Sequence, residues 1–210
     1  KAMNKLDLIN LKEPFKSLQT QGMVCHQTYK NSSDEWIFPK DVIKINDKFF
    51  TIDKKDNVSP GRIEKMSKSK KNVIDPNTIV DTFGSDTARF FILSDSPPQR
   101  DMEWTDEGVE GASRFVNKVW QLITDEDYKD IPYQKIKHNN DNDFNIFLCT
   151  YRAIKNITQA IDDFHFNIVI ANIRTLFNEL SFYKIQTNHN KIILKFCISK
   201  FLIILNPICP

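Results

Sequence analysis

Residues 65–89 read KMSKSKKNVIDPNTIVDTFGSDTAR, and this stretch decides how the rest of the chain is interpreted. It begins with a basic loop, Lys65–Ser69, in which two lysines stand three residues apart among small hydroxyl side chains. Ammonium, hydroxyl and amide donors in a loop with few large apolar residues suit a mobile polyphosphate site. Such a loop can neutralise charge that builds up on phosphate oxygens in a transition state. The alternative is a solvated basic loop, since a five-residue motif also arises by chance.

Two short helices are predicted after this loop. Asp75 is placed to cap the first helix, with Pro76 at its first position and Gly84 just past its end. Proline at the start and glycine after the end are typical of helix boundaries. Ser85 begins the second helix, which is predicted to reach Leu93.

The segment before the loop is predicted to hold one helix and a few strands. Residues 4–20 are interpreted as helical, with a break near a proline, and residues 21–29 as a strand. Two β-branched runs within 42–52 flank a two-residue Asn-Asp turn, which is the pattern of a β-hairpin. Residues 53–62 are charged and contain Pro-Gly, so we expect a loop there.

From Thr105 onward the pattern changes to long helices. Thr105 is a good helix N-cap, and two acidic residues follow it in the first turn. Apolar residues at steps of three and four predict four antiparallel helices packed as a bundle over 105–205, with a polar linker at 125–142. The fold class is therefore mixed and predominantly α. The residues expected to face the core are Val109, Phe115, Val119, Trp120 and Ile123, then Phe144, Leu148, Tyr151, Ile154, Ile157, Ile161 and Phe164, then Ile173, Leu176, Phe177 and Leu180.

The composition is that of an ordinary globular protein. The chain has 210 residues with 40% hydrophobic and 27% charged side chains, and its net charge of +2 neither favours nor excludes a nucleic-acid partner. The four cysteines are too far apart to suggest a zinc site, so we expect a reduced, cytoplasmic protein without a structural metal. The apolar run at 192–205 is too short to span a membrane and predicts a buried helix.

The stretch after the loop resembles the class I aminoacyl-tRNA synthetases that handle Leu, Ile, Val and Met. Two other stretches resemble the leucyl family in particular: EPFKSLQTQGMV at 13–24, and PP, EWTDEGVEG and RFxxxVW within 97–120. The resemblance is dense over 13–30 and 60–120, thinner over 144–205 and weakest over 31–58.

This resemblance implies an organisation into four segments. Residues 1–30 would end a Rossmann-type catalytic domain, and residues 31–58 would be a small version of the leucine-specific insertion. Residues 59–100 would carry the KMSKS loop and the connection to the helices, and residues 101–210 would be an incomplete helical anticodon-binding domain. Both ends of the chain look cut from a longer protein.

The resemblance also implies a reaction. Leucine would be activated by ATP to leucyl-adenylate and then transferred to tRNA(Leu). Lys68 would contact the ATP phosphates as the catalytic residue, and the ATP-binding set would be Lys65, Met66, Ser67, Lys68 and Ser69, with Mg²⁺ carried by the nucleotide. The HIGH motif, the leucine pocket and the editing domain would lie before Lys1. We therefore expect this segment alone to be inactive, and the parent enzyme to be monomeric.

Several other residues have both a functional and a structural interpretation. Arg114 and Lys118 share one helix face and are candidates for tRNA phosphate contacts, although a solvated face explains them equally well. Asp86 and Arg89 have the spacing of a local ion pair. Trp104 is expected to serve packing between the two parts of the chain. The four histidines receive no role.

Two other functions remain open at this point. One is a non-catalytic RNA-binding helical module, and the other is a helical interaction domain with an incidental basic loop. The block at 59–100 favours the enzyme, because an RNA-binding bundle has no need of a phosphate loop before it.

Overall fold

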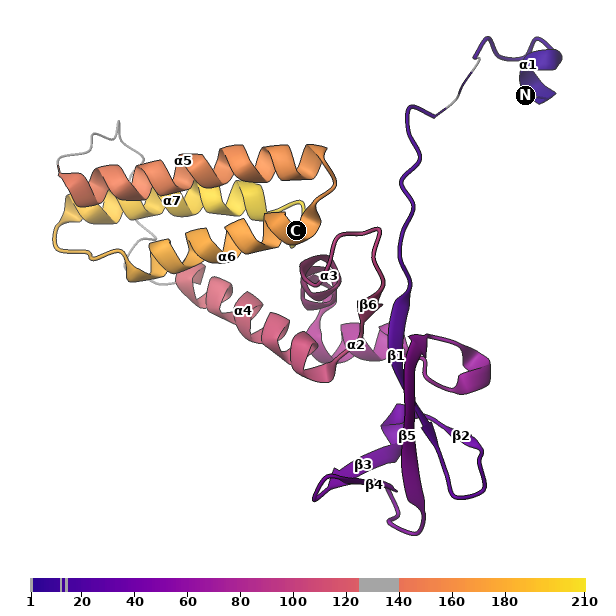
Figure 1. Cartoon of the computed structure of the whole chain (residues 1–210). Helices are drawn as coiled ribbons and strands as arrows, with labels where there is room; N and C mark the ends of the chain where they lie inside the picture. Colours follow the sequence, from indigo (N-terminus) through magenta and orange to yellow (C-terminus); the bar gives the residue numbers. More distant parts are fainter. Residues whose placement is uncertain (1, 12, 14, 125–139) are drawn as a thin grey trace.

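The computed structural model describes residues 2–11, 13, 15–124 and 140–210, which form a small twisted sheet with short helices and a set of long helices (Figure 1). The predicted mixed, predominantly α fold class is confirmed. In the described part the elements are α1 (Ala2–Lys5), β1 (Val24–Lys30), β2 (Trp36–Ile37), β3 (Val42–Ile45), β4 (Lys48–Thr51), β5 (Asn57–Lys65), α2 (Pro76–Phe83), α3 (Ser85–Ser94), β6 (Met102–Glu103), α4 (Asp106–Thr124), α5 (Asp141–Asp162), α6 (Phe166–Phe182) and α7 (Asn188–Leu205).

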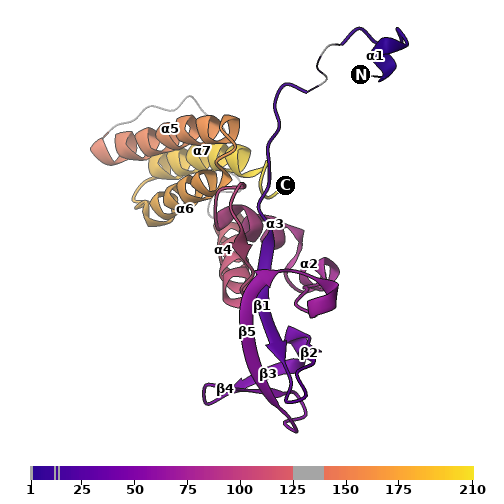
Figure 2. The ribbon, with the colours of Figure 1, turned by 45° about the vertical axis from the view of Figure 1, so that its right-hand side comes forward.

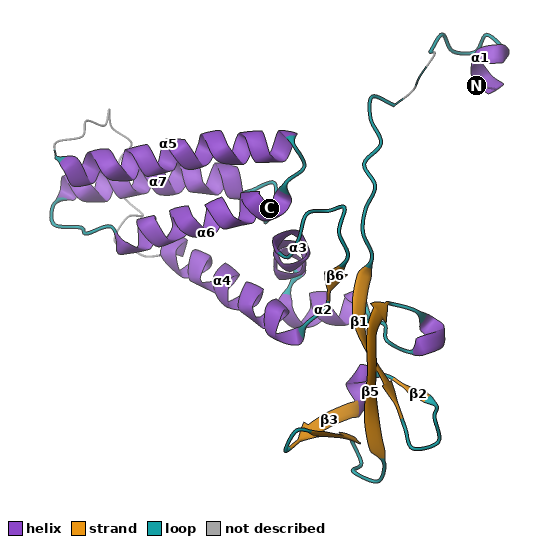
Figure 3. Ribbon diagram, viewed as in Figure 1, coloured by secondary structure: helices purple, strands orange, loops and turns teal. Residues whose placement is uncertain are grey.

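The sheet is built around the antiparallel pair β1 and β5. Its strand order is β2-β1-β5-β4-β3, and β6 pairs with β1 in parallel (Figure 3). Cys25 lies opposite Lys65, so β5 ends beside the start of β1. The basic loop therefore leaves the sheet at its central pair of strands.

The predicted hairpin at 42–52 is confirmed as β3 and β4. Ile45 lies opposite Lys48, and the two turn residues have positive φ angles, 48° at Asn46 and 60° at Asp47. Two-residue hairpin turns that match the twist of the strands need this conformation, which Asn and Asp tolerate.

The predicted loop at 53–62 is wrong over most of its length, because β5 begins at Asn57. Pro60 lies opposite Tyr29, where the β1–β5 pairing shifts register and does not require an uninterrupted ladder. Gly61 is needed at this point, since a Cβ there would lie 2.4 Å from Thr28 Oγ1. Pairing with strands on both sides thus overrides the local turn signal of Pro-Gly.

The predicted helix over 4–20 is also wrong, since α1 covers only Ala2–Lys5 and contains no buried residue. Residues 6–11, 13 and 15–20 are not helical, and Figure 1 shows this arm extending away from the sheet. A helix this short needs tertiary packing for its stability, and α1 buries no residue. The expected break at Pro14 lies outside the described residues.

The two short helices after the loop begin and end as predicted. The Asp75 side chain accepts a 2.9 Å hydrogen bond from the Asn77 amide at the start of α2. Gly84 ends α2 with φ 84°, a conformation that side-chain-bearing residues rarely adopt. Pro76 occupies the first turn, where its missing amide hydrogen is not needed.

The predicted helical bundle is confirmed for α5, α6 and α7, which lie side by side in Figures 1 and 2. α4 lies obliquely to them and packs mainly on α3. The Phe115 ring joins the two groups: it stacks on Phe90 of α3 at 4.7 Å and meets Phe177 of α6 at 5.1 Å. α4 is therefore shared between the bundle and the sheet-containing part.

The predicted core-facing residues are confirmed for α6 and partly wrong for α4 and α5. Trp120 is 67% exposed, and Phe144, Tyr151 and Phe164 of the expected α5 stripe are also exposed. Both helices carry apolar residues on more than one face, and periodicity alone does not choose between neighbouring stripes. The residues that α5 buries are Asp143, Ile146, Thr150, Ala153, Ile157 and Ala160.

The apolar run at 192–205 forms most of α7, which is a buried helix as predicted. It buries Leu194, Cys197 and Phe201 in the core of the bundle. Among the described residues, no helix has both the length and the apolar character needed to cross a membrane.

Candidate phosphate-binding loop

The basic loop connects β5 to α2 and starts as a continuation of the sheet. The Met66 amide donates a 3.0 Å hydrogen bond to the Val24 carbonyl, next to the Cys25–Lys65 pair. The chain then forms a single 3-10 turn, Lys68–Lys70, and Lys71 adopts a left-handed conformation with φ 55°. The motif is thus a compact turn attached to the central strands.

Asn72 holds both ends of this turn through one buried amide. Its side chain is 0% exposed, and its Oδ1 accepts a 2.8 Å hydrogen bond from the Ser67 amide. Its Nδ2 donates to the carbonyls of His26 and Glu64, at 3.1 Å each. Because a buried amide satisfied on both its atoms is costly to displace, Asn72 defines the base of the loop.

Met66 is the apolar anchor of the loop. Its side chain is partly buried against the core and lines a cavity of about 180 Å³ together with Val24, Ile79 and Trp104. Of the five residues predicted to bind ATP, Met66 is thus the one whose side chain packs inward.

Lys65 and Lys68 have the opposite character. Both side chains are exposed, and neither ammonium group makes a hydrogen bond or ion pair with a residue that the structure describes. The hydroxyls of Ser67 and Ser69 lie 2.8 Å apart beside them. The loop therefore offers two unpaired ammonium groups and two hydroxyls to an anion, on a base that is fixed by Asn72.

His26 lies beneath the loop in β1. Burial lowers the pKa of its imidazole, and its Nδ1 has no hydrogen-bond partner among the described residues. Its backbone carbonyl is one of the acceptors of Asn72. The sequence assigned His26 no role, and the structure makes it part of the support of the loop.

The predicted ion pair between Asp86 and Arg89 is wrong, although the structure describes both residues. Arg89 turns instead to the segment after α7, where its Nε donates to the Ile208 carbonyl at 2.7 Å and its Nη2 to the Pro207 carbonyl at 2.9 Å. Carbonyls after a helix end are favourable acceptors for a cation, and only the tertiary fold brings them near α3.

The packing interpretation of Trp104 is confirmed. Trp104 is 7% exposed, its ring meets Phe91 edge to face at 5.1 Å, and its amide donates to the Cys25 carbonyl.

Arg114 and Lys118 lie exposed on α4, and Arg114 is 3.5 Å from Glu110. These two cations are therefore accessible.

A buried polar cluster in the helical part was missed by the sequence analysis. Asp143 is 0% exposed, and its Oδ1 accepts hydrogen bonds from the Tyr183 hydroxyl at 2.7 Å and from Asn190 Nδ2 at 3.0 Å. Burial and this carboxylate raise the pKa of Tyr183. The three residues come from separate segments, so no local pattern connects them.

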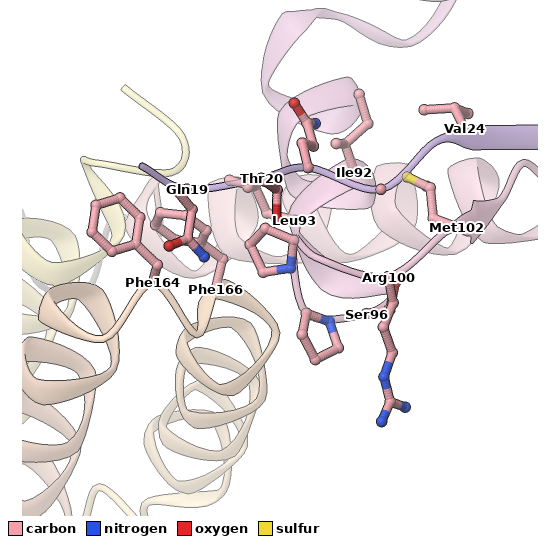
Figure 4. Close-up of a pocket in the computed structure, with 14 residues that line it drawn as sticks. Gln19, Thr20, Val24, Ile92, Leu93, Ser96, Arg100, Met102, Phe164 and Phe166 are labelled. Carbon is pink, nitrogen blue, oxygen red and sulfur yellow. The ribbon is translucent and has the colours of Figure 1, made fainter. Parts of the chain in front are cut away.

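A cavity of about 330 Å³ lies between the arm before β1, the segment after α3 and the α5–α6 connection (Figure 4). Phe164 and Phe166 line it opposite Gln19 and Thr20, and Figure 4 shows the Arg100 guanidinium directed away from the other labelled side chains. It is mostly apolar and differs in character from the basic loop.

Among the described residues, no three His, Cys, Asp or Glu side chains gather as metal ligands.

Comparisons with known proteins agree on one family. A family model of class I tRNA synthetases (I, L, M and V) matches residues 56–105, and a model of the anticodon-binding domain of tRNA ligase matches residues 143–210. A leucine–tRNA ligase of Rickettsia bellii is 42% identical over 181 residues, 86% of this chain, and one of Ehrlichia canis is 38% identical over the whole chain. The chain belongs to the leucyl-tRNA synthetase family. It spans 21% and 24% of the lengths of these two relatives.

Solved structures of synthetases have a similar fold. The LeuRS of Agrobacterium radiobacter K84, in a ternary complex with tRNA and LeuAMS, matches the whole chain with a TM-score of 0.71 at 24% identity, over 23% of its own length. The Mycobacterium tuberculosis methionyl-tRNA synthetase matches 69% of the chain with a TM-score of 0.55 at 16% identity, over 33% of its own length. This segment of the leucyl-tRNA synthetase family thus shares its fold with a family member and with a synthetase for another amino acid.

Proposed function

We propose that the chain is a segment of a leucine–tRNA ligase and supplies the phosphate-binding loop for the activation of leucine by ATP. The observation that carries this proposal is that Lys65 and Lys68 are exposed on a loop whose backbone is fixed by buried Asn72. A fixed base with free cations is the arrangement that stabilises charge in a transition state with little reorganisation.

The two lysines have different parts in this proposal. When the leucine carboxylate attacks the α-phosphate of ATP, pyrophosphate leaves and negative charge grows on the phosphate oxygens. Lys68, on the 3-10 turn, stabilises that charge, and Lys65, Ser67 and Ser69 hold the nucleotide with ammonium and hydroxyl donors. Mg²⁺ carried by the nucleotide neutralises part of the triphosphate charge. Met66, the fifth residue of the predicted set, anchors the loop to the core.

The helical part is proposed to hold tRNA(Leu). Residues 101–210 form the helical domain of this proposal, and residues 1–30, 31–58 and 59–100 form the end of the catalytic domain, a small insertion and the loop region. The match of residues 143–210 to the anticodon-binding family supports an RNA partner. Exposed Arg114 and Lys118 on α4 are the candidate phosphate contacts. The leucine pocket, the monomeric state of the parent enzyme and its cytoplasmic location remain predictions.

The second candidate is a non-catalytic RNA-binding module. The helical part fits an RNA-binding module as well as it fits a ligase. The basic loop distinguishes these two functions, because only the ligase needs a phosphate site. An RNA-binding module requires no nucleotide, so removing Lys68 would leave its single function unchanged.

The deciding experiment is ATP–pyrophosphate exchange by the full-length enzyme that contains this segment. Lys68→Ala is expected to lower the rate of leucyl-adenylate formation about 10²- to 10³-fold, the typical loss for one stabilising contact in a transition state. Lys48→Ala is the matched control, because Lys48 is an exposed lysine of the β3–β4 hairpin and lies outside the loop. Adenylate formation at the parent rate in Lys68→Ala would refute the assignment.

The 210-residue chain by itself is expected to catalyse no exchange, since it lacks the HIGH motif. Exchange above background by this chain would show that the loop and its support suffice, contrary to the proposal.

A further inference from the structure

The basic loop and the two residues after it, Lys65–Lys71, hold four lysines, and the structure divides them into two pairs. The exposed ammonium groups of Lys65 and Lys68 have no ion pair, hydrogen bond or ring contact with a described residue. Lys70 and Lys71 instead contact the small sheet: Lys70 Nζ lies 6.0 Å from the centre of the Trp36 ring, and Lys71 Nζ lies 5.6 Å from the centre of the Phe38 ring. Two adjacent cations of the loop thus lie over two aromatic rings of one short segment.

The Trp36 ring lies near two lysines, each of which has a carboxylate partner. Lys30 Nζ lies 4.6 Å from the ring centre and pairs with Asp34 at 2.7 Å. Lys70, the other cation over this ring, pairs with Glu64 of β5. Each cation has its own carboxylate, which reduces the repulsion between the two lysines. Tryptophan is the side chain that attracts cations most strongly through its face.

Phe38 has a similar but weaker arrangement. Lys40 Nζ and Lys71 Nζ each lie 5.6 Å from the centre of its ring. No carboxylate among the described residues forms an ion pair with either lysine. A phenylalanine ring binds cations less strongly than tryptophan does, so this contact should hold the loop less firmly.

We propose that Trp36 and Phe38 are positioning residues of the phosphate-binding loop, which bind Lys70 and Lys71 and thereby leave Lys65 and Lys68 free for the nucleotide. The rings lie in the segment 31–58, which resembles the family least, and reach the loop from outside the motif. This proposal rests on the proposed function in one respect: that the ligand of Lys65 and Lys68 is a nucleotide. The contact of the rings with the loop can be tested without any nucleotide.

The first experiment measures amide hydrogen exchange in the 210-residue chain. Three backbone amides are informative. The Ser67 amide donates to Asn72 Oδ1, the Lys70 amide to the Ser67 carbonyl, and the Lys71 amide to the Lys68 carbonyl. Each ring contact at an exposed site is worth a few-fold in the local opening equilibrium. Trp36→Leu is therefore expected to speed exchange of these amides about three- to fivefold, Phe38→Leu about twofold, and the double variant about tenfold.

Two further variants separate positioning from general stability. Phe49→Leu is the matched control, because the Phe49 ring of β4 lies 6.0 Å from Lys44 Nζ and holds a cation outside the loop. It should leave exchange at Ser67, Lys70 and Lys71 unchanged. Trp36→Phe keeps a ring face and should restore most of the protection that Trp36→Leu loses.

Two results would overturn the proposal. In the first, exchange at the three loop amides is the same in Trp36→Leu and the parent chain. In the second, exchange accelerates equally along β1 and β5 and Trp36→Phe fails to restore it, which would make Trp36 a support of the sheet alone.

A second experiment connects the rings to the reaction in the full-length enzyme. Trp36→Leu should raise the KM for ATP in pyrophosphate exchange about three- to fivefold and change kcat less, because it alters how often the loop is in place. An unchanged KM alongside faster loop exchange would overturn the role in nucleotide binding. The Lys68→Ala result tests the proposed function separately, so the two failures are distinguishable.

Discussion

The backbone amide of Ser67 donates a 2.8 Å hydrogen bond to the side-chain oxygen of Asn72, five residues further along the chain. The same Asn72 side chain donates to the carbonyl of His26 in β1. The side-chain amide of Asn72 thus connects Ser67 of the motif to the central strand β1. The geometry of the loop therefore depends on a residue outside the motif.

Replacing Asn72 with alanine should therefore loosen the loop and the strands beneath it. The change leaves the Ser67 amide and the carbonyls of His26, Glu64 and Lys65 without this buried partner, at a cost of about 2–3 kcal/mol in local stability. Amide exchange in β1 and β5 measures this cost. Asn77→Ala, at an exposed position in α2, is the control and should change exchange in these strands by less than about 0.5 kcal/mol. Equal effects of the two variants would contradict the role of Asn72.

The second prediction concerns the close approach of Gly61 and Thr28. A Cβ at Gly61 would lie 2.4 Å from Thr28 Oγ1, which donates a 2.7 Å hydrogen bond to the Arg62 carbonyl. Gly61→Ala should therefore destabilise the β1–β5 pair by about 1–3 kcal/mol. Amide exchange in the two strands provides the measurement.

The double variant Gly61→Ala with Thr28→Ala tests the cause. Removing the hydroxyl removes the clash, so the two substitutions together should cost less than the sum of the single changes. Strict additivity would show that contact with Thr28 is not the reason for glycine at this position.

The third prediction is a pH dependence that originates at His26. Because burial lowers the pKa of His26 in the folded chain, the unfolded chain binds more protons between that value and the ordinary value of about 6.5. The contribution of His26 to stability should fall as the pH is lowered from about 7 through this window, and level off below the folded-state pKa. Urea unfolding followed between about pH 7.5 and 5.5 measures it.

His26→Gln should flatten this part of the pH profile. His165→Gln is the control, since His165 is exposed at the start of α6, and it should leave the profile as in the parent chain. A profile that stays equally steep in His26→Gln would place the titrating group elsewhere.

The fourth prediction concerns Arg114 and Lys118 on α4. If both contact tRNA phosphates, replacing both with alanine should reduce the slope of log K against log salt for tRNA(Leu) by about 1–2. Filter binding over a range of salt concentrations measures the slope. Lys155→Ala, at an exposed position of α5, should leave it unchanged. An unchanged slope in the double variant would assign both cations to a solvated face.

The fifth prediction compares two aromatic residues of α4. Phe115 is buried between Phe90 and Phe177, so Phe115→Ala should destabilise the chain by about 3–5 kcal/mol. Trp120 is 67% exposed, so Trp120→Ala should cost less than about 0.5 kcal/mol. Urea unfolding of both variants checks the comparison, and a larger loss for Trp120→Ala would contradict the assignment of the core face.

The sequence by itself determined the features that depend on neighbours along the chain. The caps at Asp75 and Gly84, the turn at Asn46 and Asp47 and the basic motif at Lys65–Ser69 follow from the conformations and hydrogen bonds that these residue types favour locally. The resemblance of residues 13–30 and 60–120 to one family likewise rests on short motifs, each contained in a single continuous stretch.

Only the tertiary structure decided which residues meet across long separations. It paired β5 with β1 despite Pro60, turned Arg89 toward the carbonyls of Pro207 and Ile208, and buried Asp143 with Tyr183. It also separated the free lysines of the loop from the two that lie over aromatic rings. The reason is physical: burial and pairing between distant segments have energies comparable to local preferences, and no short stretch of sequence contains both partners.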